Sequence, residues 1–214
     1  MTTADVNKDT TFYVAVPHVA FTEAGIIKVK RLIDNNWEDV GGSVYSGSAS
    51  YTYLFSDNNG KLYLNYVDVT NGSKLAVKTY NQTTNSWEAL GGNSANLYLS
   101  TGTIIQNVGS QANSSHNSWM SFDSDDKPYV IFSEFASGGV PYVKKFNGSS
   151  WETMGTGAIS ADKAVAVGIT INQTTNVPYI AYVGGTGTTG TLKVYAFKNN
   201  AWAAIDFPTT TVTS

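Results

Sequence analysis

The sequence predicts an all-β protein built from a repeated unit. A hairpin pattern centred on tryptophan occurs four times, an alternating strand pattern with a tyrosine precedes each copy, and no segment shows a helical period. The tryptophan intervals are 50, 64 and 51 residues, and the tyrosine intervals are 50, 66 and 50, so both patterns recur together. The residues that define the repeat are Trp37, Trp87, Trp151 and Trp202, with Tyr13, Tyr63, Tyr129 and Tyr179 upstream.

Each unit is expected to contain four short antiparallel strands. A small-residue inner strand leads into a turn of Asp, Asn and Gly, residues that suit turns because they tolerate left-handed backbone angles. The tyrosine strand follows, and the tryptophan hairpin supplies the third and fourth strands. The expected inner strands are 50–56, 118–122 and 164–171, the tyrosine strands are 11–17, 61–68, 128–135 and 178–183, and the hairpins are 27–42, 75–92, 142–155 and 192–207.

The repeat predicts how these sheets are arranged. A four-stranded sheet cannot bury both faces alone, so the units must stack on one another, and radial stacking gives a β-propeller of about four blades. A stacked sandwich is the alternative, but it does not explain why whole units recur. Residues 1–214 are expected to form a single domain, with units at approximately 1–42, 43–92, 93–156 and 157–207.

The first unit has no inner strand of its own in the sequence. Only six residues precede its turn, whereas the tail at 208–214 (PTTTVTS) is short and β-prone. We expect this tail to supply the missing strand and close the ring, which would remove exposed strand edges. The alternatives are an incomplete ring that pairs with another chain, as a homo-oligomer, or a piece of a longer array.

The repeat also carries a family resemblance. The pattern PY[VI]xY followed by VKxxNGxxWExxG resembles the tandem propeller repeat of many secreted and surface bacterial proteins, over residues 11 to 207. The fourth unit departs from it at Tyr195 and Ala203, and no glycine follows Ile205. The resemblance implies a propeller fold and an extracellular or cell-surface bacterial location. It does not specify a function, because propellers host lectins, hydrolases, lyases and scaffolds.

Composition excludes several classes of protein. The net charge is −3, and the 13 basic residues are scattered, which does not fit a nucleic-acid partner. Apolar runs are too short for membrane insertion by a helix. The absence of cysteine excludes disulfides and thiolate metal sites. No motif for a cofactor, a metal or a catalytic nucleophile is present, so no cofactor and no catalytic residue are predicted.

We expect the functional residues to lie in segments that are not part of the repeat. The repeated tryptophans are interpreted as packing between units, with sugar platforms as the alternative. The third unit carries about 14 extra residues within 93–115, a long connection of the kind that is often functional. The candidate residues for a ligand-binding mouth are His18, Glu23, Tyr51, His116, Trp119, Glu134 and Asp162.

Three functions remain open from the sequence. The leading hypothesis is a non-catalytic propeller that binds glycans or a cell-surface protein, and the alternatives are an assembly scaffold and a carbohydrate-active hydrolase or lyase. An enzyme would need two carboxyl groups about 5–10 Å apart, which Glu23, Glu134 and Asp162 could supply. The acidic turn at 123–127 is interpreted as a turn and not as a calcium loop, because the further oxygen ligands of such a loop are missing.

Overall fold

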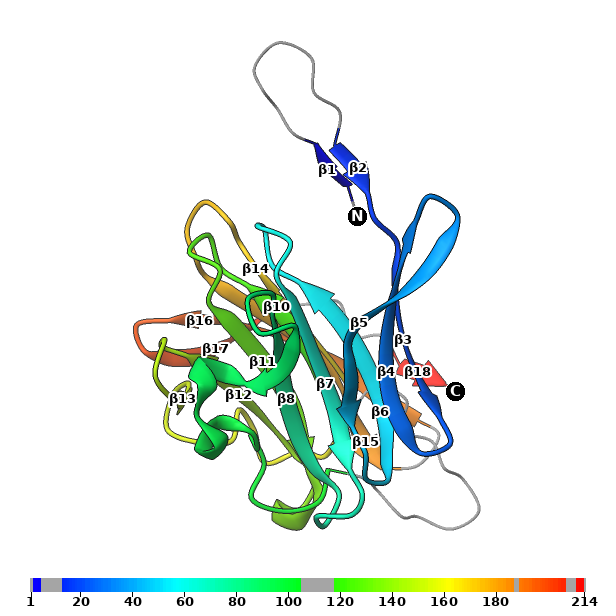
Figure 1. The fold of residues 1–214 in the computed structure, drawn as a ribbon. Helices are drawn as coiled ribbons and strands as arrows, with labels where there is room; N and C mark the ends of the chain where they lie inside the picture. Colours follow the sequence, from blue (N-terminus) through cyan, green and yellow to red (C-terminus); the bar gives the residue numbers. More distant parts are fainter. Residues whose placement is uncertain (1, 5–12, 105–117, 187–188, 207–210, 214) are drawn as a thin grey trace.

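The structure, a computed structural model, is all-β, as predicted, and describes residues 2–4, 13–104, 118–186, 189–206 and 211–213. Its strands form four successive antiparallel sheets and a separate two-stranded ribbon (Figure 1). The ribbon is β1 (Thr2–Ala4) and β2 (Tyr13–Ala15), and the first sheet is β3 (His18–Glu23), β4 (Ile26–Ile33) and β5 (Asn36–Tyr45).

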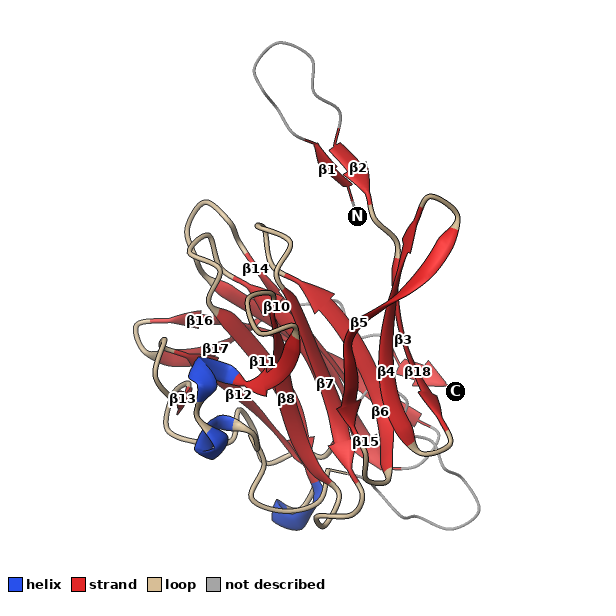
Figure 2. Ribbon diagram, in the orientation of Figure 1, coloured by secondary structure: helices blue, strands red, loops and turns tan. Residues whose placement is uncertain are grey.

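The other three sheets each contain a four-strand meander, as the repeat predicts. The second sheet is β6 (Ala49–Ser56), β7 (Leu62–Asp68), β8 (Lys74–Asn81) and β9 (Ser86–Ala89); the third is β10 (Ser118–Phe122), β11 (Pro128–Glu134), β12 (Val140–Phe146) and β13 (Trp151–Thr153); the fourth is β14 (Ala164–Ile171), β15 (Pro178–Thr186), β16 (Thr189–Lys198) and β17 (Ala201–Ile205). Three short 3-10 helices lie in connections: η1 (Leu90–Gly92), η2 (Ser94–Asn96) and η3 (Phe135–Ser137) (Figure 2).

Three apolar clusters hold neighbouring sheets together. One joins the first and second sheets around Val29 and Tyr66, the next joins the second and third around Leu75 and Phe132, and the last joins the third and fourth around Ile131. Each sheet therefore buries a face against the next sheet along the chain. Within the part of the chain that the structure describes, no apolar cluster joins the fourth sheet to the first.

The repeated tryptophans pack between sheets, which confirms their sequence interpretation for three of the four. Each donates its indole N–H to a backbone carbonyl that comes before its own sheet in the chain: Trp87 to Val40 at 2.8 Å, Trp151 to Asn96 at 2.9 Å and Trp202 to Met154 at 3.2 Å. We call this contact the tryptophan seat. Trp37, in the first unit, joins none of the apolar clusters of the described residues, and 49% of it is exposed.

Glycine at position 41 makes room for the first of these seats. Gly41 has φ 73°, and a Cβ there would lie 2.8 Å from Trp87 Cδ1 and 2.9 Å from the Tyr80 ring. We expect Gly41→Ala to destabilise the fold by about 1–3 kcal/mol more than Gly42→Ala, the added cost of overpacking. Gly42 is a matched control because it has φ 67° and open space around it, so its alanine variant reports backbone strain alone. Equal losses on urea unfolding of the two variants would contradict the steric role of Gly41.

The turns at one end of the sheets bind one another. Figure 1 shows the β6–β7, β10–β11 and β14–β15 turns side by side at this end, where Asn58 N–H donates to Asp126 Oδ1 at 2.9 Å and Ser124 N–H donates to Asn176 Oδ1 at 2.9 Å. In the acidic turn, Asp123 Oδ1 accepts from two backbone N–H groups, and Oδ2 accepts from Tyr129 and Lys145. These bonds confirm the interpretation of 123–127 as a turn.

The first unit differs from the prediction. The expected strand at 11–17 is replaced by β2, which pairs with β1, and by β3, which pairs with β4 in the register His18↔Arg31. The physical reason is a two-residue turn at Ala24 and Gly25, with φ 50° and 81°, which suits a tight hairpin. Because this hairpin closes a very short loop, residues 18–23 take the place beside β4 that the repeat assigned to residues 11–17.

The tail also pairs differently from the expectation. Its described part, β18 (Thr211–Thr213), pairs with residues 189–191 of β16 and so extends the fourth sheet. The expectation that 208–214 supplies the inner strand of the first unit is therefore wrong for this structure. A closed ring of blades is not seen among the described residues, and the architecture that is established is a row of four packed antiparallel sheets.

Candidate ligand-binding site

The candidate site lies on the inner strands β6 and β10. Both strands begin at the end of the sheets opposite to the bonded turns, where the sequence placed a binding mouth, and run towards those turns. Its side chains come from the second and third sheets, which pack tightly around a shared apolar cluster.

Trp119 is the centre of the site. It lies on β10, outside the tryptophan repeat, and 38% of it is exposed. Its ring meets Phe55 edge-on, with centroids 5.3 Å apart at 89°, and Tyr53 at 5.9 Å and 61°. Aromatic pairs prefer such edge-to-face contacts, which fix the orientation of the indole. We call Tyr53, Phe55 and Trp119 the aromatic platform.

Tyr51 lies next to the aromatic platform on β6. It adopts a left-handed backbone conformation with φ 50°, at the irregularity where the β6–β7 register shifts between Ser50 and Tyr53. The side chain is half-buried and packs on the core between the second and third sheets. Burial, together with the neighbouring Tyr51, raises the pKa of Tyr53, so its hydroxyl remains a hydrogen-bond donor at neutral pH.

Buried polar atoms without partners lie beside the platform. Asn65 pairs with Tyr53 across the β6–β7 ladder, so both side chains point to one face of the sheet. Its amide N–H donates to Ser118 Oγ at 3.3 Å, next to Trp119, but its Oδ1 accepts nothing. The other side-chain oxygens of this end that have no hydrogen bond within the described chain are Ser50 Oγ, Thr52 Oγ1, Tyr66 OH and Ser133 Oγ.

These unpaired atoms indicate the kind of ligand that the site can hold. Asn65 and Ser133 are both 0% exposed, and leaving such groups unpaired costs roughly 1–3 kcal/mol each. Ser133 lies two residues after Ile131, which pairs with Trp119, so Ser133 and Trp119 share a face of the third sheet. Groups of this kind are normally satisfied by ordered water or by a bound polar molecule. The site thus combines an aromatic surface with uncharged hydrogen-bonding atoms.

Glu134, a predicted site residue, is fully engaged in the structure. It is 6% exposed, and its Oε1 accepts from Thr101 N–H at 2.6 Å, Thr101 Oγ1–H at 2.9 Å and Gly102 N–H at 2.9 Å. Burial raises its pKa, but these bonds outweigh burial and hold the pKa below its usual value. Glu134 therefore anchors the long connection as a carboxylate, and its second oxygen, Oε2, accepts from Ser137 Oγ–H at 3.3 Å.

Asp68 occupies the same repeat position in the second unit and was missed by the sequence interpretation. It is 0% exposed and accepts hydrogen bonds from the hydroxyls of Tyr45 and Tyr98, each at 2.6 Å, and from the backbone and side chain of Asn71. Both carboxylates come five residues after a repeated tyrosine, and that spacing is the signal that could have found Asp68. The two acids tie the connections of this end to the sheets.

His18 and Glu23 lie on the first sheet, apart from the aromatic platform. His18 starts β3, and its Nδ1 is 2.8 Å from the carbonyl oxygen of Val16; burial is the largest influence on its pKa, which is lowered. Glu23 ends β3 and forms an exposed ion pair with Lys28 at 2.6 Å, which lowers the pKa of Glu23. Both side chains therefore have local partners, and neither contributes to the platform.

The two remaining predicted residues are Asp162 and His116. Asp162 lies before β14, where its carboxylate pairs with Lys193 of β16. His116 lies outside the described residues. Of the seven candidates, the structure brings only Tyr51 and Trp119 to the same surface. Tyr53 and Phe55 were not predicted, although the alternation of Tyr51, Tyr53 and Phe55 along β6 is a period-two signal for one aromatic face.

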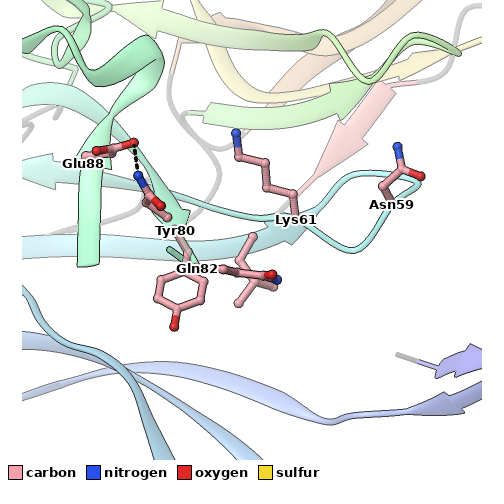
Figure 3. A pocket seen from close by; sticks show the side chains of 7 residues that line it. Asn59, Lys61, Tyr80, Gln82 and Glu88 are labelled. Atoms are coloured by element: carbon pink, nitrogen blue, oxygen red, sulfur yellow. Dashed lines mark hydrogen bonds between the residues drawn. The ribbon is translucent and has the colours of Figure 1, made fainter. Parts of the chain in front are cut away.

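An open pocket lies at the other end of the second sheet (Figure 3). It has a volume of about 440 Å³ and is lined by side chains of the β6–β7 and β8–β9 turns and of the adjoining ends of β7, β8 and β9: Asn59, Lys61, Leu62, Tyr80, Asn81, Gln82 and Glu88. Asn81 Nδ2 donates to Glu88 Oε1 at 3.1 Å, which uses part of the carboxylate. Its aromatic side chain, Tyr80, packs on the repeated Trp87 with ring centroids 5.5 Å apart, whereas Trp119 lies outside the repeat.

Neither a metal centre nor a membrane span is evident in the described segments. They contain no group of three or more His, Cys, Asp and Glu side chains placed to hold a metal ion. Their helices are also too short to cross a bilayer. The carboxylates named as a possible catalytic pair lie on separate elements, and the pKa of Glu23 and of Glu134 is lowered, whereas a general acid needs a raised pKa.

Comparison with known proteins yields matches among solved structures alone. The sequence matches no family model and no curated protein. An ulvan lyase of polysaccharide lyase family PL25, bound to -[GlcA(1-4)Rha3S]-, is 14% identical with a TM-score of 0.53, over 86% of this chain and 49% of the lyase. The same lyase described without that ligand gives a TM-score of 0.52. A fucose lectin from Kordia zhangzhouensis in complex with methyl-fucoside is 11% identical, over 73% of this chain and 98% of the lectin, with a TM-score of 0.43.

The likeness to the lyase extends to the fold and no further at this identity. The chain spans about half of the length of the lyase it matches. It therefore resembles part of a larger all-β fold.

Proposed function

We propose that this protein binds a neutral glycan at the aromatic platform, without catalysis. The observation that carries the proposal is the position of Trp119, the one tryptophan outside the repeat, half-exposed on an inner strand and oriented by Tyr53 and Phe55. Three of the repeated tryptophans are used for packing between sheets, so Trp119 is available for a ligand. The proposal refines the sequence hypothesis of glycan binding and keeps two of its candidate residues, Trp119 and Tyr51.

Sugar chemistry fits the two halves of the site. The C–H face of a pyranose ring packs on an indole, while its hydroxyl groups both donate and accept hydrogen bonds, as sites with an apolar face and a few polar groups require. Asn65 and Ser133 are 0% exposed, so their unpaired oxygens make the surroundings of the platform polar and uncharged but do not contact the sugar directly. Because the platform and its polar neighbours carry no charge, we expect a neutral saccharide to bind better than a sulfated or uronic one.

The architecture that we propose is a propeller-type arrangement of blades, on the surface of or outside a bacterial cell. Four successive antiparallel sheets, three of them with the same meander and each packed on its neighbour, support the blade interpretation. The fold-level likeness to an ulvan lyase, which binds an oligosaccharide in one of its structures, is consistent with glycan recognition on this type of fold. The location rests on the repeat resemblance alone.

The test is binding of defined oligosaccharides by calorimetry and thermal shift. We expect a neutral oligosaccharide to stabilise the folded protein by RT ln(1 + [L]/Kd), which raises the melting temperature, and we expect Trp119→Ala to weaken that binding by about tenfold or more. Trp37→Ala is the matched control, because Trp37 is similarly exposed but lies on the first sheet. The proposal fails if no saccharide stabilises the wild type, or if Trp119→Ala binds as tightly as Trp37→Ala.

A further inference from the structure

The described residues contain the tryptophan seat three times. Each seat has an inserting half, the tryptophan and its cross-strand neighbour, and a receiving half on the sheet before it, and each half is exposed once, at Trp37 and at Ile205. In every filled seat an aromatic or apolar side chain on the third strand pairs with the tryptophan: Tyr80 with Trp87, Phe146 with Trp151 and Phe197 with Trp202. Leu32 pairs with Trp37 in the same register in the first unit. The first unit thus carries a complete inserting half, and 49% of its Trp37 is exposed.

The receiving half is defined by the residue three positions after each tryptophan. Val40 is 3% exposed, Leu90 is 2% exposed, and Met154 packs partly buried in the cluster between the third and fourth sheets. The backbone carbonyls of Val40 and Met154 accept the indole N–H directly, and the Leu90 carbonyl accepts from Asn96, whose own carbonyl accepts Trp151. In the fourth unit this position is Ile205, which is apolar like the others but 37% exposed.

The outer strand of the fourth unit is uncharged as well as exposed. In β17, Ala201, Ala203, Ala204 and Ile205 are exposed, and none of them carries a charge. The comparable strands of the other units carry acids next to the tryptophan, at Glu38, Glu88 and Glu152. An exposed, uncharged edge strand is a site for pairing with another chain. Ala203, in place of the glutamate of the other units, therefore makes this outer edge suited to contact with protein.

We propose that the Trp37 face of one chain docks on the Ile205 edge of a second copy, which extends the tryptophan seat between chains. Two copies related by a two-fold axis make this contact twice, so eight units close into one ring, within the range of known propellers. Trp37 donates its indole N–H to the Ile205 carbonyl region of the partner, as Trp87 does to Val40. The proposal is independent of the glycan site.

The Ile205 edge of a second copy is a better partner for the Trp37 face than the Ile205 edge of the same chain. Among the described residues no apolar cluster joins the first sheet to the fourth, and β18 pairs with β16 of the fourth sheet. The interface is continuous with three contacts already formed within the chain. The match to half of a larger all-β fold is also consistent with a doubled assembly.

One residue weakens the fourth seat. The first three units have glycine after the receiving position, at Gly41, Gly91 and Gly155, each with φ between 67° and 80°, whereas the fourth has Asp206. The Cβ and charge of Asp206 hinder the approach of the indole, so we expect a reversible dimer with a concentration-dependent mass. Asp206→Gly should tighten the dimer about threefold or more, because glycine restores the left-handed backbone option of the other seats.

The experiment is sedimentation equilibrium of the full chain, over a concentration series, with variants of each half. The wild type is expected to approach twice the 22.9 kDa of one chain. Trp37→Ala and Ile205→Asp should each weaken association by about 30-fold or more, as loss of an interface hot spot does. Val69→Asp, at a residue 40% exposed in the β7–β8 connection, is the matched control and should leave the mass unchanged.

Mixing the variants identifies the geometry. A head-to-tail contact predicts that Trp37→Ala and Ile205→Asp chains together form a heterodimer that keeps one intact interface of the two. Circular dichroism confirms that each variant is folded before the masses are compared. A monomeric wild type at all concentrations, a dimer insensitive to Trp37→Ala, or failure of the mixed variants to associate more strongly than either alone would each overturn the proposal. Glycan binding measured with a monovalent saccharide should be unchanged in Trp37→Ala, so the two proposals can fail separately.

Discussion

Replacing Trp87 with alanine is expected to lower the free energy of unfolding by about 3–5 kcal/mol, the usual cost of removing a buried aromatic side chain. Trp87 is 7% exposed, packs on Tyr80 with ring centroids 5.5 Å apart, and donates its indole N–H to the Val40 carbonyl at 2.8 Å. The variant loses this burial and leaves a cavity between the first and second sheets. It also leaves the Val40 carbonyl without its partner.

Trp37→Ala is the matched comparison for this effect. Trp37 occupies the same position in the repeat but is 49% exposed, so its removal should cost less than about 1 kcal/mol in the isolated chain. Denaturant unfolding followed by circular dichroism, at protein concentrations low enough to suppress association, measures both variants. Equal losses would mean that the repeated tryptophan stabilises its own hairpin and not the contact between units.

The contrast between these two tryptophans shows what a repeat can predict. Recurrence at a fixed position indicated packing between units, and Trp87, Trp151 and Trp202 confirm it. The strands of units two to four were predicted within a few residues, because alternation and turn residues are local signals. Trp37 differs, because 49% of it is exposed and it joins none of the apolar clusters of the described residues, and the sequence pattern around it does not indicate this difference.

The features that differ from the prediction depend on competition between alternative strand pairings and on contacts between residues that are far apart in the sequence. In the first unit, the tight Ala24-Gly25 turn favoured a local hairpin over the repeat register. Glu134 was predicted to face a ligand, but Thr101, which lies 33 residues away in sequence, uses its carboxylate. The sequence could not indicate a role for Asn65, because whether a buried amide lacks a hydrogen-bond partner depends on the folded structure around it.

Replacing Asp68 with alanine is expected to cost roughly 3 kcal/mol of stability at neutral pH. The variant removes an acceptor that holds the hydroxyls of Tyr45 and Tyr98, each at 2.6 Å, and the side chain of Asn71 at 2.8 Å. These donors come from three separate segments, and hydrogen bonds to a charged acceptor contribute about 1.5–3 kcal/mol each, reduced here because Tyr45 and Tyr98 are only half-buried and Asn71 is exposed. Asp39→Ala is the control, because the side chain of Asp39 is 60% exposed in its ion pair with Lys30, and exposed pairs contribute less than about 1 kcal/mol.

The pH dependence of this effect follows from the direction of the pKa shift. Burial raises the pKa of Asp68, but the hydrogen bonds from Tyr45, Tyr98 and Asn71 outweigh burial, so the pKa in the folded state is lowered. The folded protein then binds fewer protons at this group than the unfolded chain, whose pKa is about 3.9. The stabilisation is therefore fully present above that value and is lost as the pH falls through the folded pKa. Urea unfolding of wild type and Asp68→Ala should show a gap that is constant from pH 6 to 8 and narrows below about pH 4; a gap that widens on acidification would mean that Asp68 is protonated in the folded state.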